Sequence, residues 1–154
     1  MSQPCNDPLR VYLDTNVVIR GMERTDAGAG EVGRLTELAE SGKLALVTSE
    51  LTLSEVLVGP IKLRDDLLVK AYLDMLTKDR GFELCPVTGD VLIESSHVRA
   101  RSSARLPDSV HVATAVLAGC RLIVSYDRRL RDLSDLDVIE PSAELFEKLD
   151  AETP

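Results

Sequence analysis

The fold of this chain is set by one stretch near its beginning, Val11-Tyr12-Leu13-Asp14-Thr15-Asn16-Val17-Val18-Ile19. It is a short apolar run that stops at a carboxylate, a hydroxyl and an amide and then becomes apolar again. Such a run predicts a buried strand with Asp14 at its C-terminal end. In open α/β sheets ligands gather outside the carboxyl ends of strands, so Asp14 stands where chemistry is done. The competing interpretation is that Asp14 and Thr15 only cap the helix that follows.

The size and composition of the chain indicate one globular domain over residues 1–154. A chain of this length can bury a substantial core. No apolar run approaches the ~20 residues of a membrane span, and the first ten residues are too polar for a secretory signal. The three cysteines, Cys5, Cys85 and Cys120, lack close pairing. They fit reduced thiols in a cytoplasmic protein and give no zinc spacing.

Charge and aromatic content limit the ways in which this chain binds nucleic acid. The net charge of −8 argues against a protein that coats nucleic acid. The absence of Trp and the scarcity of other aromatic residues argue against a base-stacking platform. A nucleic-acid enzyme can still be acidic overall where its acids hold metal ions and its arginines are grouped locally.

Strands alternate with helices along the whole chain. Further strands are predicted at residues 44–47, 83–87, 120–125 and 137–139. Helices or helical turns are predicted at residues 16–20, 31–41, 51–58, 63–78, 90–100, 106–119, 128–133 and 142–149. Residues 21–33 are predicted to form a mobile loop, Gly59-Pro60 to end a helix, and residues 150–154 to fray. This alternation implies a three-layer α/β/α domain with a central parallel sheet.

Four acids occupy corresponding positions in this pattern: Asp14, Glu55, Asp108 and Asp127. Two follow apolar strands, and two lie on helices that come after strand–loop units. Each alone has an ordinary explanation as a helix cap or a surface charge, but together they are expected at one end of a parallel sheet. Clustered carboxylates repel one another unless a cation joins them. Ligation by oxygen alone suits Mg²⁺ or Mn²⁺ rather than zinc.

Four blocks around these acids carry a family resemblance, in the order Leu13-Asp14-Thr15-Asn16, Ser49-Glu50-Leu51-Thr52-Leu53-Ser54-Glu55-Val56-Leu57-Val58-Gly59-Pro60, Leu106-Pro107-Asp108-Ser109-Val110-His111-Val112-Ala113-Thr114-Ala115 and Val124-Ser125-Tyr126-Asp127-Arg128-Arg129-Leu130. They cover nearly the whole chain. The chain resembles PIN-domain ribonucleases, in particular the VapC-type toxins of bacterial toxin–antitoxin pairs. The resemblance implies endonucleolytic RNA cleavage that depends on Mg²⁺ or Mn²⁺. It also implies that Asp14, Glu55, Asp108 and Asp127 form the acidic set.

The same resemblance implies partners and supporting residues. A small antitoxin is expected to bind near the acidic site and block it. A homodimer is also expected, with residues 63–78 and 31–41 as amphipathic helices that motivate it. Thr15, Asn16 and Ser125 are candidates to orient the carboxylates. Ser125 stands where the family more often has Thr, which keeps the hydroxyl.

Arginine and histidine residues near Asp108 each have two interpretations. Arg101 and Arg105 lead into Asp108 and are candidate contacts for RNA phosphates, although solvated helix faces would look the same. His111 lies three residues after Asp108 on the same helical side. We interpret it as a packed histidine without a catalytic role.

Two other functions compete with a nuclease. The first is a PIN-like module that binds a partner without activity, against which four intact acids argue. The second is a haloacid-dehalogenase-type phosphatase, which also places an Asp after its first strand. That chemistry needs a second Asp two residues after the first, and here the position is Asn16.

Overall fold

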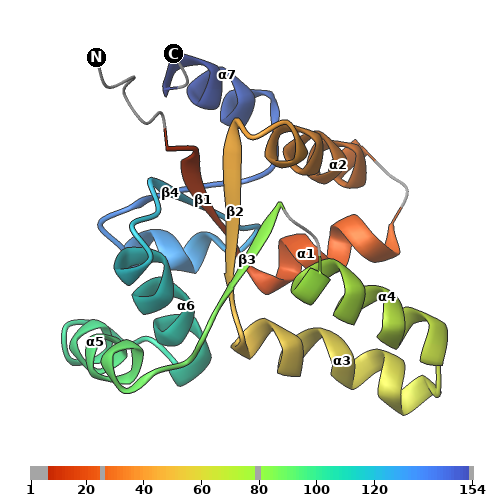
Figure 1. The fold of residues 1–154 in the computed structure, drawn as a ribbon. Helices are drawn as coiled ribbons and strands as arrows, with labels where there is room; N and C mark the ends of the chain where they lie inside the picture. Colours follow the sequence, from red (N-terminus) through yellow and green to blue (C-terminus); the bar gives the residue numbers. More distant parts are fainter. Residues whose placement is uncertain (1–6, 25–26, 79–80, 153–154) are drawn as a thin grey trace, which may run out of the picture.

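A computed structural model describes residues 7–24, 27–78 and 81–152. Strands and helices alternate along them as predicted (Figure 1). In chain order the elements are β1 (Leu9–Leu13), α1 (Thr15–Glu23), α2 (Ala27–Glu40), β2 (Leu44–Ser49), α3 (Leu51–Leu63), α4 (Asp66–Lys78), β3 (Phe82–Cys85), α5 (Gly89–Ala100), α6 (Leu106–Leu117), β4 (Leu122–Val124), the 3₁₀ helix η1 (Arg128–Asp132), β5 (Asp137–Ile139) and α7 (Ala143–Glu152).

The five strands form one parallel sheet in the order β3-β2-β1-β4-β5. β1 lies in the centre, where Val11 is in register with Leu46 of β2 and with Leu122 of β4. A parallel sheet needs cover on both faces because its strands are apolar on both sides. The expectation of a central parallel sheet between helices is therefore confirmed.

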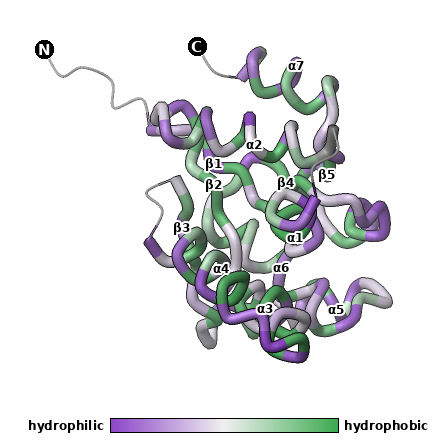
Figure 2. The backbone as a smooth tube through the Cα atoms, turned by 90° about the vertical axis from the view of Figure 1, so that its right-hand side faces the viewer, coloured by the Kyte–Doolittle hydropathy of each residue, from purple (hydrophilic) through white to green (hydrophobic). Residues whose placement is uncertain are grey.

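Two apolar cores lie on the two faces of this sheet. Side chains alternate along a strand, so Val11 and Leu13 point to one core while Tyr12 points to the other. The first core takes buried residues from α1, α2, α3, α4 and α7, and the second takes them from α5, α6 and η1. Figure 2 shows the hydrophobic strands in the middle of these layers.

The prediction of a loop over residues 21–33 is wrong for the part of it that the structure describes. α1 continues through Gly21 to Glu23, and α2 begins at Ala27; residues 25–26 lie outside the described ranges. A Cβ atom on Gly21 would come within 2.5 Å of Val32 Cγ1. Gly21 therefore serves the close packing of α1 on α2, and the glycine that suggested a loop is a helix-packing residue.

The prediction that Gly59-Pro60 ends a helix is also wrong. α3 runs on through the buried Pro60 to Leu63, and it ends where Arg64 adopts a left-handed conformation with φ of 56°. Proline removes one backbone donor from the helix, but burial of its ring in the tertiary structure outweighs that loss. The helix predicted over residues 63–78 consequently begins only at Asp66.

Other boundaries differ from prediction by a few residues. The last helix extends to Glu152, so residues 150–152 are helical, and residues 153–154 lie outside the described part. The stop signal at Gly119 is correct: this glycine has φ of 69° just after α6. Cys85 and Cys120 are free thiols, and burial raises the pKa of Cys120 to about 12. Cys5 lies outside the described residues.

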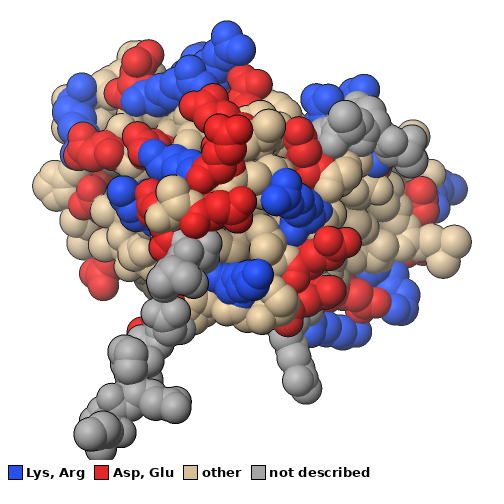
Figure 3. Space-filling model, turned by 90° about the horizontal axis from the view of Figure 1, so that it is seen from above, with Lys and Arg blue, Asp and Glu red and all other residues tan. Residues whose placement is uncertain are grey.

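Two surface properties bear on function. None of the helices within the described ranges has both the length and the apolar character needed to cross a membrane. On the face at the amino ends of the strands, acidic and basic side chains are interspersed (Figure 3). That face carries no broad basic area of the kind that binds nucleic acid without specificity.

Candidate active site at the carboxyl end of the sheet

The four acids come from four elements that meet at the carboxyl edge of the sheet. Asp14 directly follows β1, and Asp127 comes three residues after β4. Glu55 lies near the start of α3, which follows β2, and Asp108 lies in the first turn of α6. Because the strands are parallel, these ends share one edge. The structure brings the acids together as an inner pair, Asp14 and Glu55, and an outer pair, Asp108 and Asp127.

Asp14 is a desolvated carboxylate with several donors around it. It is 8% exposed and accepts hydrogen bonds from Thr15 N (2.8 Å), Ser125 Oγ (2.7 Å) and Asn16 Nδ2 (3.1 Å). Burial raises the pKa of Asp14, and nearby Glu55 raises it further. His111 and the hydrogen bonds from Ser125 and Thr15 act against that rise without cancelling it. An ionised Asp14 is therefore only partly compensated by the protein itself.

Asn16 and Ser125 connect the ends of β1 and β4 around Asp14. Asn16 Nδ2 donates to Ser125 Oγ (3.2 Å), and Asn16 Oδ1 accepts from Tyr126 N (3.2 Å). Ser125 Oγ also accepts from Asp127 N (2.9 Å). The side chains that sequence reasoning named as orienting residues thus contact Asp14 directly and are themselves fixed.

Thr15 has both roles that the sequence allowed, at the start of a helix and as a partner of a carboxylate. Its backbone N–H is capped by Asp14, as in an ordinary helix start. Its hydroxyl donates to Glu55 Oε2 and lies 3.2 Å from Thr52 Oγ1. The same residue therefore begins α1 and links the two inner acids.

His111 is the residue whose surroundings sequence reasoning missed. It is buried, as predicted, but both ring nitrogens face polar atoms. Nδ1 lies 2.6 Å from the Tyr12 hydroxyl, and Nε2 lies 2.8 Å from Glu55 Oε2 and 3.9 Å from Asp14 Oδ1. The signals in the sequence were its spacing from Asp108 and the alternation that turns Tyr12 toward α6.

The contacts of Glu55 favour its ionised form. Burial on its own would raise the pKa of Glu55, but the hydrogen bonds from His111 and Thr15 outweigh burial and hold the pKa below its ordinary value. Both of these bonds end on Oε2. Within the part of the chain that the structure describes, Oε1 is the oxygen of Glu55 that remains for another partner.

The outer acids are paired with arginines. Arg105 Nε lies 3.3 Å from Asp108 Oδ2. Arg129 binds both oxygens of Asp127, with Nη2 at 2.7 Å from Oδ2 and Nε at 3.0 Å from Oδ1. The bond from Arg129 lowers the pKa of Asp127, and the charge of Arg105 adds to this. The hydrogen bond to Asp127 raises the pKa of Arg129, and the charge of Asp108 adds to this, so the four charges form one alternating cluster.

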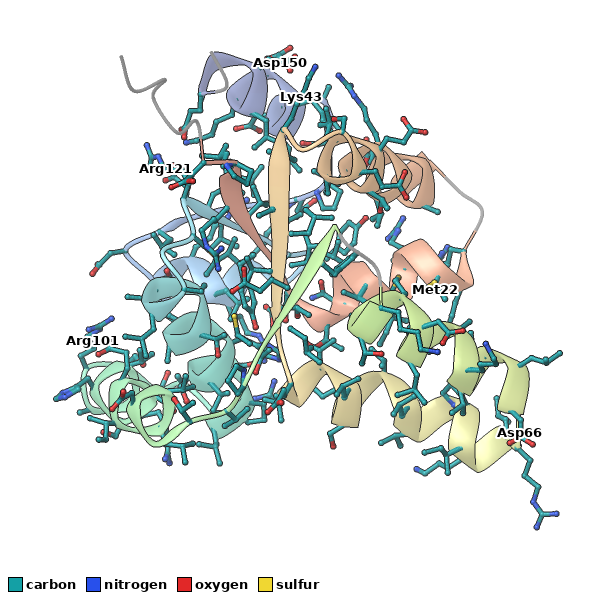
Figure 4. The ribbon with its side chains drawn as sticks, viewed as in Figure 1. Met22, Lys43, Asp66, Arg101, Arg121 and Asp150 are labelled. Atoms are coloured by element: carbon teal, nitrogen blue, oxygen red, sulfur yellow. The ribbon has the colours of Figure 1, made fainter. Side chains whose placement is uncertain are left out.

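Of the two arginines predicted to contact RNA at the site, Arg105 reaches the site and Arg101 does not. Arg105 is the N-cap residue of α6 and touches Asp108. Arg101 is an exposed residue at the end of α5, and its side chain points away from the sheet (Figure 4). Arg129, which was not among the predicted contacts, reaches the site instead, while its neighbour Arg128 pairs with Glu140.

The carboxylate oxygens of this site suit a hard divalent cation, but the four acids do not converge on one point. Carboxylate oxygens at the inner pair are what Mg²⁺ and Mn²⁺ prefer. Among the described residues, no three His, Cys, Asp or Glu side chains are placed to hold a metal ion. Asp108 and Asp127 point to arginines rather than to Asp14 and Glu55. In this structure the inner pair is therefore open to a cation, while the two outer acids are paired with arginines.

Several solved structures share this fold. DNA-bound VapBC from Salmonella typhimurium matches with a TM-score of 0.67 at 17% identity, over 87% of this chain and 99% of that chain. VapBC2 from Rickettsia felis, bound to a promoter DNA fragment, matches with a TM-score of 0.66 at 13% identity, over 86% and 98%. A toxin–antitoxin complex from Klebsiella pneumoniae matches with a TM-score of 0.60 at 21% identity, over 86% and 98%. Identities this low show the fold alone.

Sequence comparison identifies a family for this chain but no individual curated relative. A search of curated proteins gives no match. Residues 11–136 match the PIN domain, a span that begins within β1 and includes all four acids. Since this match covers most of the chain, the protein belongs to the PIN domain family.

Proposed function

We propose that this chain is a metal-dependent endoribonuclease and the toxin of a toxin–antitoxin module. The observation that supports the proposal is Asp14, which is buried and only partly compensated beside Glu55 at the carboxyl edge of the sheet. Asp108 and Asp127 are the further acids that the proposal assigns to this site. PIN domains are typically nucleases, and the solved structures of similar fold include a toxin–antitoxin complex. An antitoxin that covers this edge is the partner that the proposal requires.

The four acids would hold Mg²⁺ or Mn²⁺ against the scissile phosphate. A cation held in this way activates water and offsets the charge that develops on the phosphate. The protein's own part is to present oriented carboxylates. Ser125 and Asn16 fix Asp14 Oδ2, and Thr15 fixes Glu55 Oε2. Such supporting bonds reduce the reorganisation that binding would otherwise need.

One assay decides between this function and its competitors. Purified protein is incubated with total RNA in Mg²⁺, in Mn²⁺ or in EDTA. We expect cleavage at internal positions with either cation and none in EDTA. Intact RNA in all three conditions would contradict the nuclease proposal and favour a PIN module that only binds partners. Release of phosphate from small monoesters without RNA cleavage would favour the phosphatase.

Arg105 and Arg129 fit a second role in this function. In the metal-free protein they neutralise the two outer acids. With those acids engaged in holding a cation, both guanidinium groups would be available for RNA phosphates. Arginine is well suited to this exchange because one planar fork fits both carboxylate and phosphate.

Replacing Arg129 by Gln should therefore raise Mn²⁺ affinity and weaken RNA engagement at the same time. The log–log salt dependence of kcat/KM should become shallower by about one phosphate contact. Arg128→Gln is the matched control, since the Arg128 side chain is also largely exposed but pairs with Glu140. Equal effects of the two substitutions on Mn²⁺ affinity and on the salt dependence would show that only bulk charge matters.

Of the two segments that motivated the homodimer, residues 63–78 keep exposed apolar side chains and residues 31–41 do not. The apolar side chains of α2 that motivated it, Val32, Leu35 and Ala39, are buried in the core. Exposed apolar side chains lie instead on α3 and α4: Val58, Ile61, Leu63, Leu67 and Leu73. We infer that this end of the helix pair forms the contact between two copies.

A double substitution tests this contact. Leu63→Glu with Leu67→Glu should convert the dimer to monomers without lowering the melting temperature of the single chain, because both side chains are exposed. Sedimentation velocity measures the change. Leu92→Glu with Ile93→Glu on α5 is the control and should leave the dimer intact. A wild-type protein that sediments as a monomer at all concentrations would contradict the proposal.

A further inference from the structure

Two buried side chains outside the acidic set, Tyr12 and His111, are joined in a way that packing alone does not require. Tyr12 is fully buried in β1, and His111 is 3% exposed in α6. The Tyr12 hydroxyl lies 2.6 Å from Nδ1, and Glu55 Oε2 lies 2.8 Å from Nε2 on the other side of the ring. The three side chains thus form a continuous chain from the interior of the sheet to an inner acid.

The direction of these hydrogen bonds follows from the groups at the two ends. An ionised carboxylate only accepts hydrogen bonds, so Nε2 must carry the hydrogen that faces Glu55. In a neutral imidazole the other nitrogen is then an acceptor, and the Tyr12 hydroxyl must donate to it. The Tyr12 hydroxyl, fully buried and 2.6 Å from Nδ1, is the group placed to donate that hydrogen bond.

We propose that Tyr12 and His111 are positioning residues that hold Glu55 for the metal. This inference rests on the proposed nuclease function. The Tyr12 hydroxyl fixes the tautomer of His111, and Nε2–H together with the Thr15 hydroxyl fixes Oε2 of Glu55. Oε1 would then be the oxygen of Glu55 that holds the cation. His111 itself is not a ligand, because its Nε2 carries a hydrogen.

Glu55 needs such support more than the other inner acid does. Asp14 has a short side chain and three donors from its own surroundings. Glu55 has an additional rotatable bond, and its side chain is 33% exposed on α3. Supporting partners of metal ligands typically change metal affinity by about 10- to 100-fold when removed.

A packing role is the alternative. The rings of Tyr12 and His111 make an edge-to-face contact, with centroids 6.0 Å apart. Packing would be served equally by Phe at position 12 and largely by Leu at position 111. The two roles therefore differ in their response to substitutions that keep the shape of the side chain and remove its hydrogen bonds.

The test measures Mn²⁺ affinity by electron paramagnetic resonance of the free ion. His111→Leu should bind Mn²⁺ about tenfold more weakly, and Tyr12→Phe should weaken binding in the same direction by less. His111→Gln should retain most of the affinity, because its amide N–H can replace Nε2–H. Tyr72→Phe is the matched control, since Tyr72 is equally buried but donates to Glu23.

Folded His111→Leu protein with wild-type Mn²⁺ affinity, or equal affinities of the Leu and Gln variants, would overturn the positioning role. Weak binding by Tyr72→Phe equal to that by Tyr12→Phe would do the same. A wild-type chain that binds no Mn²⁺ would instead contradict the proposed function.

A second measurement needs neither metal nor activity. Nitrogen NMR of the metal-free protein should show His111 with hydrogen on Nε2 and a bare Nδ1. The exposed His97, the other histidine of the chain, is the internal reference. Hydrogen on Nδ1 with a bare Nε2 would overturn the proposed chain of hydrogen bonds.

Discussion

Replacing Asp14 by Asn is expected to lower Mg²⁺-dependent RNA cleavage by at least about 100-fold while the chain stays folded. The substitution keeps the size of the side chain and removes the charge that a cation needs. Asn is as good an N-cap as Asp, and its oxygen can still accept from Thr15 N. A residue that only capped α1 would therefore tolerate the change. Initial rates of RNA cleavage for wild type and variant measure the difference.

The control for this prediction is an acid of similar local role that lies far from the site. Asp66 stands in the first turn of α4, at the far end of the helix pair (Figure 4). Asp66→Asn should retain wild-type activity. If Asp14→Asn also cleaves RNA at the wild-type rate, Asp14 is a helix cap and the metal site has been assigned to the wrong residues.

The sheet, and the position of Asp14 and Asp127 just after two of its strands, could be predicted from the sequence because they depend on local patterns. An apolar run followed by polar residues gives the end of a strand, and parallel strands place all such ends on one edge. Asp14 and Asp127 could be located in this way. Predicting that the four acids share this edge requires no knowledge of side-chain conformation.

The contact between His111 and Glu55 could not be predicted, because it depends on packing between distant segments. His111 and Glu55 are 56 positions apart, and nothing in either local sequence indicates a hydrogen bond between them. The pairing of Asp127 with Arg129 rather than with the inner acids is likewise a matter of side-chain geometry. The predictions of a loop at Gly21 and of a helix end at Pro60 were wrong for the same reason, because the neighbours of these residues in space determine their role.

Metal binding should also stabilise the folded chain. A ligand that binds only the folded state adds about 2.7 kcal/mol at a concentration 100 times its Kd. For a domain of this size that corresponds to a rise of roughly 5–10 °C in melting temperature. Wild type should show this rise with Mn²⁺ or Mg²⁺, and Asp14→Asn should show little of it. Thermal melts with increasing cation, compared with EDTA, provide the measurement.

The pH dependence of stability without metal provides a second, independent test of the role of Asp14. Burial holds the pKa of Asp14 above its unfolded value, so the folded state retains the proton more tightly than the unfolded state does. The contribution of Asp14 to stability is therefore present at low pH and lost as the pH rises through its folded pKa. Glu55 has the opposite sign, because its pKa is lowered: its contribution is present above its unfolded pKa and lost as the pH falls.

Substitution separates these two contributions. Asp14→Asn removes the first and leaves the second, so the variant should gain stability relative to wild type as the pH rises from about 4 to about 7 in EDTA. A cap role predicts otherwise: loss of a charge near a helix start lowers stability by about 0.3–1 kcal/mol whether metal is present or not. Added Mn²⁺ should reverse the order of the two proteins near pH 7, because only wild type then compensates its buried carboxylate with a cation. A variant that melts lower than wild type in EDTA and responds equally to Mn²⁺ would remove Asp14 from the proposed metal site.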